Sequence, residues 1–126
     1  MTPARVHSAS PFETRYGFCR ALRIGDRVEV AGTAPIGDDG NTFPGDAHAQ
    51  ATRCFAIALR ALAELGAGPE HVVRTRMYIV DPADADLVGR AHGEAFGAHP
   101  PVATMVVVKA LLDPAWLVEI EVEARV

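Results

Sequence analysis

The sequence has few aromatic residues, one lysine and two cysteines, and these shortages argue against several classes of protein. Aromatic residues make up 6% of the chain, lysine occurs once, at Lys109, and the net charge is −4. These shortages argue against a nucleic-acid-binding protein, which carries a basic surface and aromatic rings that stack on bases. The two cysteines, Cys19 and Cys54, fit neither a disulfide framework nor a CxxC metal site. No apolar run reaches the roughly 18–20 residues that a membrane-spanning helix needs.

Familiar catalytic motifs are missing as well. The chain contains no Walker loop, GxGxxG, GxSxG or HExxH. The five histidines show no ligand spacing, so we expect neither a metal nor a cofactor. The first 12 residues lack the apolar segment of a secretory signal. With two cysteines outside any disulfide pattern, we expect a cytoplasmic protein.

What remains is typical of one compact domain over residues 1–126. Hydrophobic residues make up 49% and charged residues 22%, which excludes a disordered chain. Hydrophobic periodicity predicts the order β-β-α-β-α-β-β after an irregular segment 1–15. We expect strands at 17–23, 27–33, 74–80, 104–109 and 118–126, and helices at 47–65 and 82–96. Five strands and two helices predict an α+β fold, a single mixed sheet with two helices on one face.

Local signals refine this prediction. Asp46 is placed to cap the first helix, and residues 34–46 have the composition of a loop. Four consecutive apolar residues in 104–109 indicate a central strand. Asp86, Arg90 and Glu94 are spaced to form a charged ladder along the second helix. His92 borders the apolar stripe of that helix, where a hydrogen-bonded structural role is favoured over catalysis, and both cysteines are expected to be buried.

The last strand alternates clearly. Its apolar residues share one face, while Glu119, Glu121 and Glu123 follow one another on the other at ~6.6 Å intervals. Neighbouring strands would place Arg74, Arg76, Arg20 or Arg27 on the same side. The glutamates then either pair with these arginines across strands, or one of them acts as a general acid or base. Because this face is half polar and half aliphatic, we expect it to pack against copies of itself.

Four segments resemble the Rid (YjgF) family: residues 28–35, 72–79, 101–105 and 117–121. The resemblance implies a chorismate-mutase-like fold and a homotrimer with small-molecule clefts between subunits. It also implies hydrolysis of reactive enamines and imines, such as 2-aminoacrylate, without a cofactor or a metal.

The resemblance also implies site residues. Glu119 matches the catalytic glutamate that positions the hydrolytic water, Tyr16 the tyrosine of the cleft, and Gly32 the backbone amide donor. Arg90 stands where relatives have a helix asparagine. The substrate-binding residues implied are Tyr16, Gly32, Thr33, Arg90, Ala103, Thr104 and Met105.

One difference from the deaminating members stands out. Ala103 replaces the arginine that holds the substrate carboxylate bidentately, and Met105 replaces a neighbouring cysteine. The chain therefore resembles the arginine-lacking branch of the family, with a more apolar pocket and a substrate without the usual α-carboxylate. Arg74, Arg76 or Arg90 could supply a replacement charge.

Three functions follow from this comparison. The first is a hydrolase for a small imine, an enamine or a related carbonyl-derived metabolite. The second is a non-catalytic ligand-binding or stress-response trimer. The third is an endoribonuclease or translation inhibitor, against which the pI of 5.7 and the single lysine argue.

Overall fold

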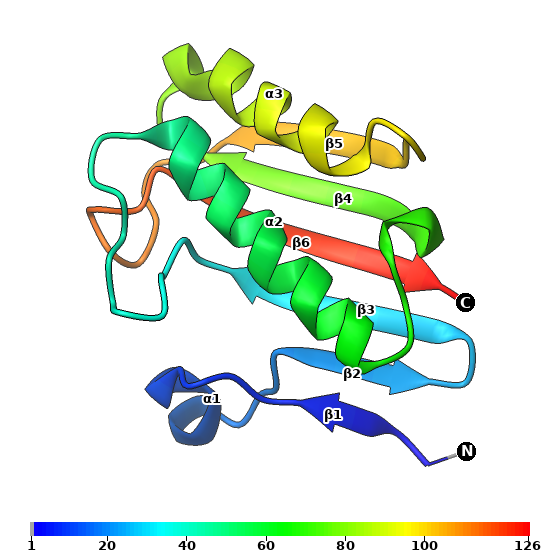
Figure 1. The fold of residues 1–126 in the computed structure, drawn as a ribbon. Helices are drawn as coiled ribbons and strands as arrows, with labels where there is room; N and C mark the ends of the chain where they lie inside the picture. The colour runs from blue at the N-terminus through cyan, green and yellow to red at the C-terminus, as the bar shows by residue number, and fades with distance from the viewer. Residues whose placement is uncertain (1) are drawn as a thin grey trace.

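One mixed sheet organises the chain. The computed structural model describes residues 2–126, whose strands lie in the order β1-β2-β3-β6-β4-β5 (Figure 1). Strands β4 and β5 run parallel, and every other neighbouring pair is antiparallel. The predicted α+β fold with a single mixed sheet is therefore confirmed. The strands are β1 (Ala4–Val6), β2 (Ala21–Ile24), β3 (Arg27–Thr33), β4 (Val72–Ile79), β5 (Val102–Val107) and β6 (Val118–Arg125).

Two helices cover one face of this sheet. Helices α2 (Ala47–Glu64) and α3 (Ala85–Phe96) lie side by side on it (Figure 1). Asp46 caps α2 as predicted, because its carboxylate accepts a hydrogen bond from the backbone N–H of Ala49 at 2.9 Å. Phe55 and Phe96 are about 1% exposed between helices and sheet. Burying a large apolar side chain stabilises the fold by about 1.5–3 kcal/mol, so this layer holds the core. Within residues 2–126, no helix is long and apolar enough to span a membrane.

The alternation of the strands sets the two faces of the sheet. Val118, Ile120 and Val122 of β6 are at most 1% exposed beneath the helices, as predicted. The opposite face, called the open face below, carries the side chains of Arg74, Arg76, Tyr78, Glu119, Glu121 and Glu123. The predicted two faces of β4 and β6 are therefore confirmed.

The N-terminal segment is more ordered than its composition suggested. Residues 1–15 were expected to be irregular, but they include β1 and a short helix, α1 (Pro11–Tyr16). The Ser10 side chain accepts a hydrogen bond from Phe12 N, and Pro11 occupies the first helical turn. Gly17 ends the helix at φ 77°, a left-handed conformation that favours glycine. The strand predicted from residue 17 consequently begins only at Ala21.

The prediction that residues 104–109 form a central strand is wrong. Strand β5 spans Val102–Val107 and pairs only with β4, so it is an edge of the sheet. Its valines remain open, with Val102, Val106 and Val107 exposed by 58%, 42% and 53%. The apolar run predicts burial under the chain's own elements, whereas the structure leaves these valines exposed.

Side-chain predictions for the helices hold in part. His92 Nε2 lies 2.7 Å from the Thr75 hydroxyl, so the histidine is the structural one expected. Arg90 pairs with Asp86 at 3.3 Å, but Glu94 turns to His48 of α2 at 2.8 Å, so the predicted ladder forms only in its first half. Cys54 is buried and Cys19 is only half-buried.

Candidate functional site

A bulge in β3 shapes the open face. Val30 pairs with Val122 and Thr33 with Ile120, so β3 holds one residue more than β6 over this stretch. The bulge turns Thr33 into the core, where it is 0% exposed, and leaves Gly32 on the side of Glu119. A Cβ atom at Gly32 would lie 2.7 Å from Glu119 Oε2. Because glycine has no side chain, position 32 leaves room for the Glu119 carboxylate.

The three glutamates of β6 differ in their partners. Glu123 lies 3.8 Å from Arg74 and 3.6 Å from Arg76, and Glu121 accepts a hydrogen bond from the Tyr78 hydroxyl. Within residues 2–126, the Glu119 carboxylate has no hydrogen-bond donor and no ion-pair partner within 4.0 Å. The interpretation as cross-strand ion pairs thus holds for Glu123 and does not hold for Glu119.

Glu119 also has an altered acidity. Burial raises the pKa of its carboxyl, the charge of Arg20 opposes this rise, and the nearby Glu121 adds to it. A half-buried carboxylate with free lone pairs and a raised pKa can accept a hydrogen bond from a water molecule and then its proton. This is the chemistry that a general base requires.

Arg20, one of the arginines expected on the side of the glutamates, contributes to this region. It is 8% exposed, and its Nη1 atom donates to the Gly32 carbonyl at 2.8 Å and to the Thr33 hydroxyl at 3.3 Å. Its Nε atom lies 3.6 Å from the Glu13 carboxylate. The position of Arg20 depends on helix α1 and on the bulge, and periodicity predicts neither of them.

Glu13 anchors Arg20 from helix α1. The Glu13 carboxylate is 2% exposed and accepts hydrogen bonds from the Ser8 hydroxyl and from Ser8 N at 3.0 Å. Burial alone would raise the pKa of Glu13, but the two Ser8 donors and the charge of Arg20 lower it below the usual value. Glu13 therefore stays ionised and holds the guanidinium in place.

A hollow of about 710 Å³ opens beside this cluster. Gly17, Phe18 and Cys19 line it on one side, and Ala31 and Glu121 on the other. Phe18 lies under the Arg20 guanidinium, with 5.7 Å between the ring centroid and Cζ. Phe18 and Cys19 are thus further candidate binding residues. Sequence reasoning missed Phe18, and it favoured a buried Cys19 over one near a site, because it placed residues 17–20 in a regular strand.

Tyr16 lies outside that hollow. It is 67% exposed at the end of α1, where its ring stacks on Phe12 at 6.0 Å and Arg15 lies over both rings. The structure thus places the tyrosine on the surface of α1, available to a partner or a ligand that approaches from outside.

The remaining predicted residues lie elsewhere in the chain. Thr104 pairs with Arg76 and shares the open face, whereas Ala103 and Met105 pair with Thr75 and Met77 and share the helix-covered face. Strands β4 and β6 separate β5 from β3. Gly32, Thr33 and Glu119 come together within the chain, while Ala103, Thr104 and Met105 stand apart at the β5 edge.

None of the arginines considered as a replacement charge is free. Arg90 lies on α3 in the helix layer, 61% exposed, and pairs with Asp86. Arg74 and Arg76 both pair with Glu123. Each of these three guanidiniums therefore has a carboxylate partner within 4.0 Å in the chain itself.

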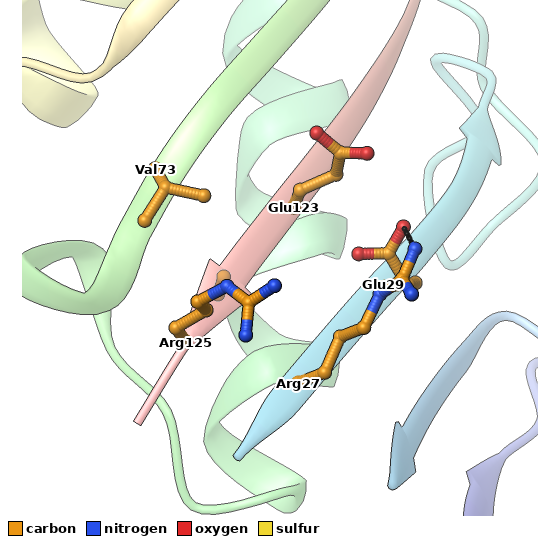
Figure 2. Close-up of a pocket in the computed structure, with 6 residues that line it drawn as sticks. Arg27, Glu29, Val73, Glu123 and Arg125 are labelled. Atoms are coloured by element: carbon orange, nitrogen blue, oxygen red, sulfur yellow. Dashed lines mark ion pairs between the residues drawn. The ribbon is translucent and has the colours of Figure 1, made fainter.

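A second hollow, of about 200 Å³, lies at the other end of the open face. Figure 2 shows Glu29 of β3 and Glu123 of β6 on its walls, with Arg27 and Arg125 at one end. Its charges are largely committed, because Arg27 lies 3.6 Å from Glu29 and Arg125 lies 3.6 Å from Asp26. Burial raises the pKa of Glu29, Arg27 opposes this rise and the facing Glu123 adds to it. No residue predicted for the site lines this hollow.

The arrangement of possible metal ligands was the remaining feature of the site predicted from the histidine spacing. Across residues 2–126, no three His, Cys, Asp or Glu side chains come together in a way that could hold a metal ion.

Comparison with known proteins assigns the family. The family model described as endoribonuclease L-PSP matches residues 8–126. The chain belongs to the YjgF/Rid family. A Rid-family crystal structure from Mycobacterium tuberculosis, described as a member of the highly conserved YjgF/YER057c/UK114 family, is 42% identical. It superposes with a TM-score of 0.90 over 99% of this chain and 100% of that one.

Two further relatives extend this membership. An uncharacterised protein of Streptomyces coelicolor is 46% identical over 120 residues, which is 95% of this chain and 90% of that protein. A RutC family protein of Pyrococcus abyssi is 30% identical over 95 residues, 75% of each chain. The Rid resemblance and the chorismate-mutase-like fold are therefore confirmed.

Proposed function

We propose that this Rid-family protein is a hydrolase for a small imine, an enamine or a related carbonyl-derived metabolite. The observation that supports this most is the Glu119 carboxylate, which stands unpaired beside the Gly32 bulge while its neighbours on β6 are engaged. A carboxylate that served only the fold would be expected to pair as Glu123 does. Free thiols at Cys19 and Cys54 suit a reducing compartment such as the cytoplasm.

The proposed reaction uses water alone. Glu119 accepts the proton of a water molecule as the water oxygen bonds to the carbon of the C=N group. Glu119 returns this proton to the nitrogen, which gives a carbinolamine. The hydroxyl proton of the carbinolamine then passes by way of Glu119 to the amino group as the C–N bond breaks, so that ammonia and a carbonyl compound leave. An enamine first tautomerises to the imine, gaining a proton at its β-carbon and losing one from nitrogen. The backbone N–H of Gly32 is the proposed donor that orients the ligand. No oxidant or reductant is consumed.

The proposed site is completed by a second copy of the chain. Ala103, Thr104 and Met105 lie on the β5 edge, which β4 and β6 separate from Gly32. The exposed valines of β5 and the exposed Tyr16 ring are surfaces that a neighbouring subunit would cover. A homotrimer that brings the β5 edge of one subunit to the open face of the next would form three such clefts.

The residues present favour a substrate without an α-carboxylate. Position 103 carries alanine, and Arg74, Arg76 and Arg90 are engaged with Glu123 and Asp86. A carboxylate buried without a partner costs several kcal/mol, so a neutral or apolar substrate fits better. We therefore expect weak or no turnover of 2-aminoacrylate.

Replacing Glu119 tests the proposal. Glu119→Gln keeps the shape of the side chain and removes its basicity, which typically lowers a rate by about 10²–10⁴-fold. Glu123→Gln is the matched control, since it changes a paired glutamate on the same face. Imines and enamines generated in situ supply the substrate, and ammonia release measures turnover. Equal turnover in wild type and Glu119→Gln would leave a ligand-binding trimer as the better account.

RNA cleavage is the second candidate, because the matching family model is described as an endoribonuclease. Against it, the net charge is −4 and the arginines of the open face are paired with glutamates. An RNase that neutralises phosphates loses affinity steeply as salt rises. Titrating a single-stranded RNA at several salt concentrations decides between the two: a steep loss supports RNA binding, and no measurable binding excludes it.

A further inference from the structure

Arg20 and Glu119 meet at Gly32 from two sides. The guanidinium holds the Gly32 carbonyl at 2.8 Å, and the Glu119 carboxylate lies 2.7 Å from where a side chain at Gly32 would begin. Gly32 of β3 therefore lies next to both the Arg20 guanidinium and the Glu119 carboxylate. Their proximity follows from the bulge, which turns Gly32 toward the glutamate.

Arg20 is enclosed where it stands. Its exposed fraction is 8%, its Nη1 atom is bonded to Gly32 and Thr33, and its Nε atom is buried without a hydrogen-bond partner within residues 2–126. The nearest acceptor to Nε is the Glu13 carboxylate at 3.6 Å. A guanidinium held in this way acts through its charge and its backbone bonds, because it has no free side to offer a ligand. Charge acts strongly there, since little water screens it.

We propose that Arg20 is a positioning residue for this site, which fixes the bulge at Gly32 and places a positive charge near the Glu119 carboxylate. This role differs from that of the arginine that position 103 lacks, because Arg20 does not contact the substrate. The proposal deepens the proposed function, on which its catalytic meaning rests. The effect of the Arg20 charge on the titration of the Glu119 carboxyl can be measured without an activity assay.

The other groups around Glu119 do not supply this charge. Glu121, on the same strand, is anionic and raises the pKa of Glu119 further. Tyr78 of β4 is the register partner of Glu119 and donates its hydroxyl to Glu121. Cys54 of α2 is buried, and burial raises the pKa of its thiol, so it stays neutral. Arg20 is the cation that opposes these influences.

Carboxyl ¹³C NMR of the full-length protein tests the proposal. The glutamate resonances are titrated in wild type, Arg20→Gln and Arg20→Lys, with Glu119→Gln used to assign the Glu119 signal. An opposite charge nearby lowers a carboxyl pKa by about 1–3 units, so Arg20→Gln should raise the Glu119 midpoint by about one unit or more. Arg20→Lys keeps the charge and should stay closer to wild type. Arg23→Gln is the matched control, since Arg23 also binds backbone carbonyls, of Gly25 and Leu65.

The outcomes separate this inference from the proposed function. A folded Arg20→Gln whose Glu119 midpoint equals that of wild type overturns the inference, as does an equal shift in Arg23→Gln. Should Arg20→Gln fail to fold, Arg20→Met tests the same loss of charge with an apolar side chain that fills the enclosed site: the Glu119 midpoint should again rise, and an unchanged midpoint overturns the inference. If the midpoints shift as expected but Glu119→Gln retains full turnover, the charge relation stands and the hydrolase proposal fails.

Discussion

At the scale of single residues, the side chains around Glu119 distinguish it from the other two glutamates of β6. Glu121 and Glu123 repeat the same pattern on β6, yet Tyr78 and two arginines engage them. Gly32 leaves room for Glu119, and Arg20 supplies a nearby charge. A glycine in a bulge thus decides which glutamate remains available.

Position 103 offers a gain-of-binding prediction. Ala103→Arg introduces a planar guanidinium at the β5 position that the family resemblance assigns to a carboxylate-binding arginine. Affinity for 2-oxobutyrate should tighten at least about tenfold, equivalent to roughly 1.4 kcal/mol. Isothermal titration calorimetry measures it, with Val107→Arg on the same face of β5 as the control. A folded, oligomeric Ala103→Arg that binds no better than wild type would show that position 103 lies outside the cleft.

The sequence located part of this site and could not locate the rest. Alternation along β6 and the Rid resemblance single out Glu119 and Gly32, because both rest on local patterns. Strand alternation predicts Arg20 on the side of the glutamates, but it predicts neither the contacts of Arg20 nor the place of Phe18. Both depend on helix α1, a six-residue element set by Ser10, Pro11 and Gly17. Periodicity needs longer segments than that to give a signal.

At the scale of elements, a neutral histidine joins helix α3 to the sheet. His92 bonds Thr75 of β4 and packs against the rings of Phe55 and Phe96 at 5.5 and 4.9 Å. Burial lowers the pKa of His92 below 6.5. The unfolded chain, in which the ring is free, therefore takes up a proton at higher pH than the folded chain does.

The sign of the resulting pH dependence follows directly. The contribution of His92 to stability is fully present above the unfolded pKa of about 6.5 and is lost as pH falls below it. Urea unfolding at steps from pH 8 to pH 5 should show this loss in wild type and in His99→Gln, an exposed control. His92→Gln should lack this component of the decline. An identical decline in all three proteins would assign the pH dependence to other groups.

The edge strand shows where pattern and packing diverge. Residues 105–108 are consecutively apolar, which indicates a strand covered on both faces, yet β5 lies at the margin of the sheet. The pattern is consistent with burial only if another copy covers the edge. The position of β5 within the sheet is set by pairings between distant segments, which no local pattern specifies.

At the scale of the whole molecule, the open face and the β5 edge lead to a prediction of size. Light scattering coupled to size exclusion should give about three times the 13.4 kDa chain mass at micromolar concentration. Val106→Lys places a charge on the exposed edge and should shift the protein toward smaller species. Leu112→Lys is the control, at a side chain 96% exposed beyond β5. A wild-type protein that runs as a clean monomer contradicts the proposed cleft.

Mixed oligomers test most directly whether Glu119 of one subunit and β5 of another form one site. Glu119→Gln removes the base and Ala103→Trp obstructs the β5 side, so each variant alone should be inactive. When the two are unfolded together in equal amounts and refolded, about a quarter of the shared sites should join two intact halves. Turnover should then recover to about a quarter of wild type, and separately refolded variants should stay inactive after mixing. No recovery in mixed oligomers that have reassembled would contradict a site shared between subunits.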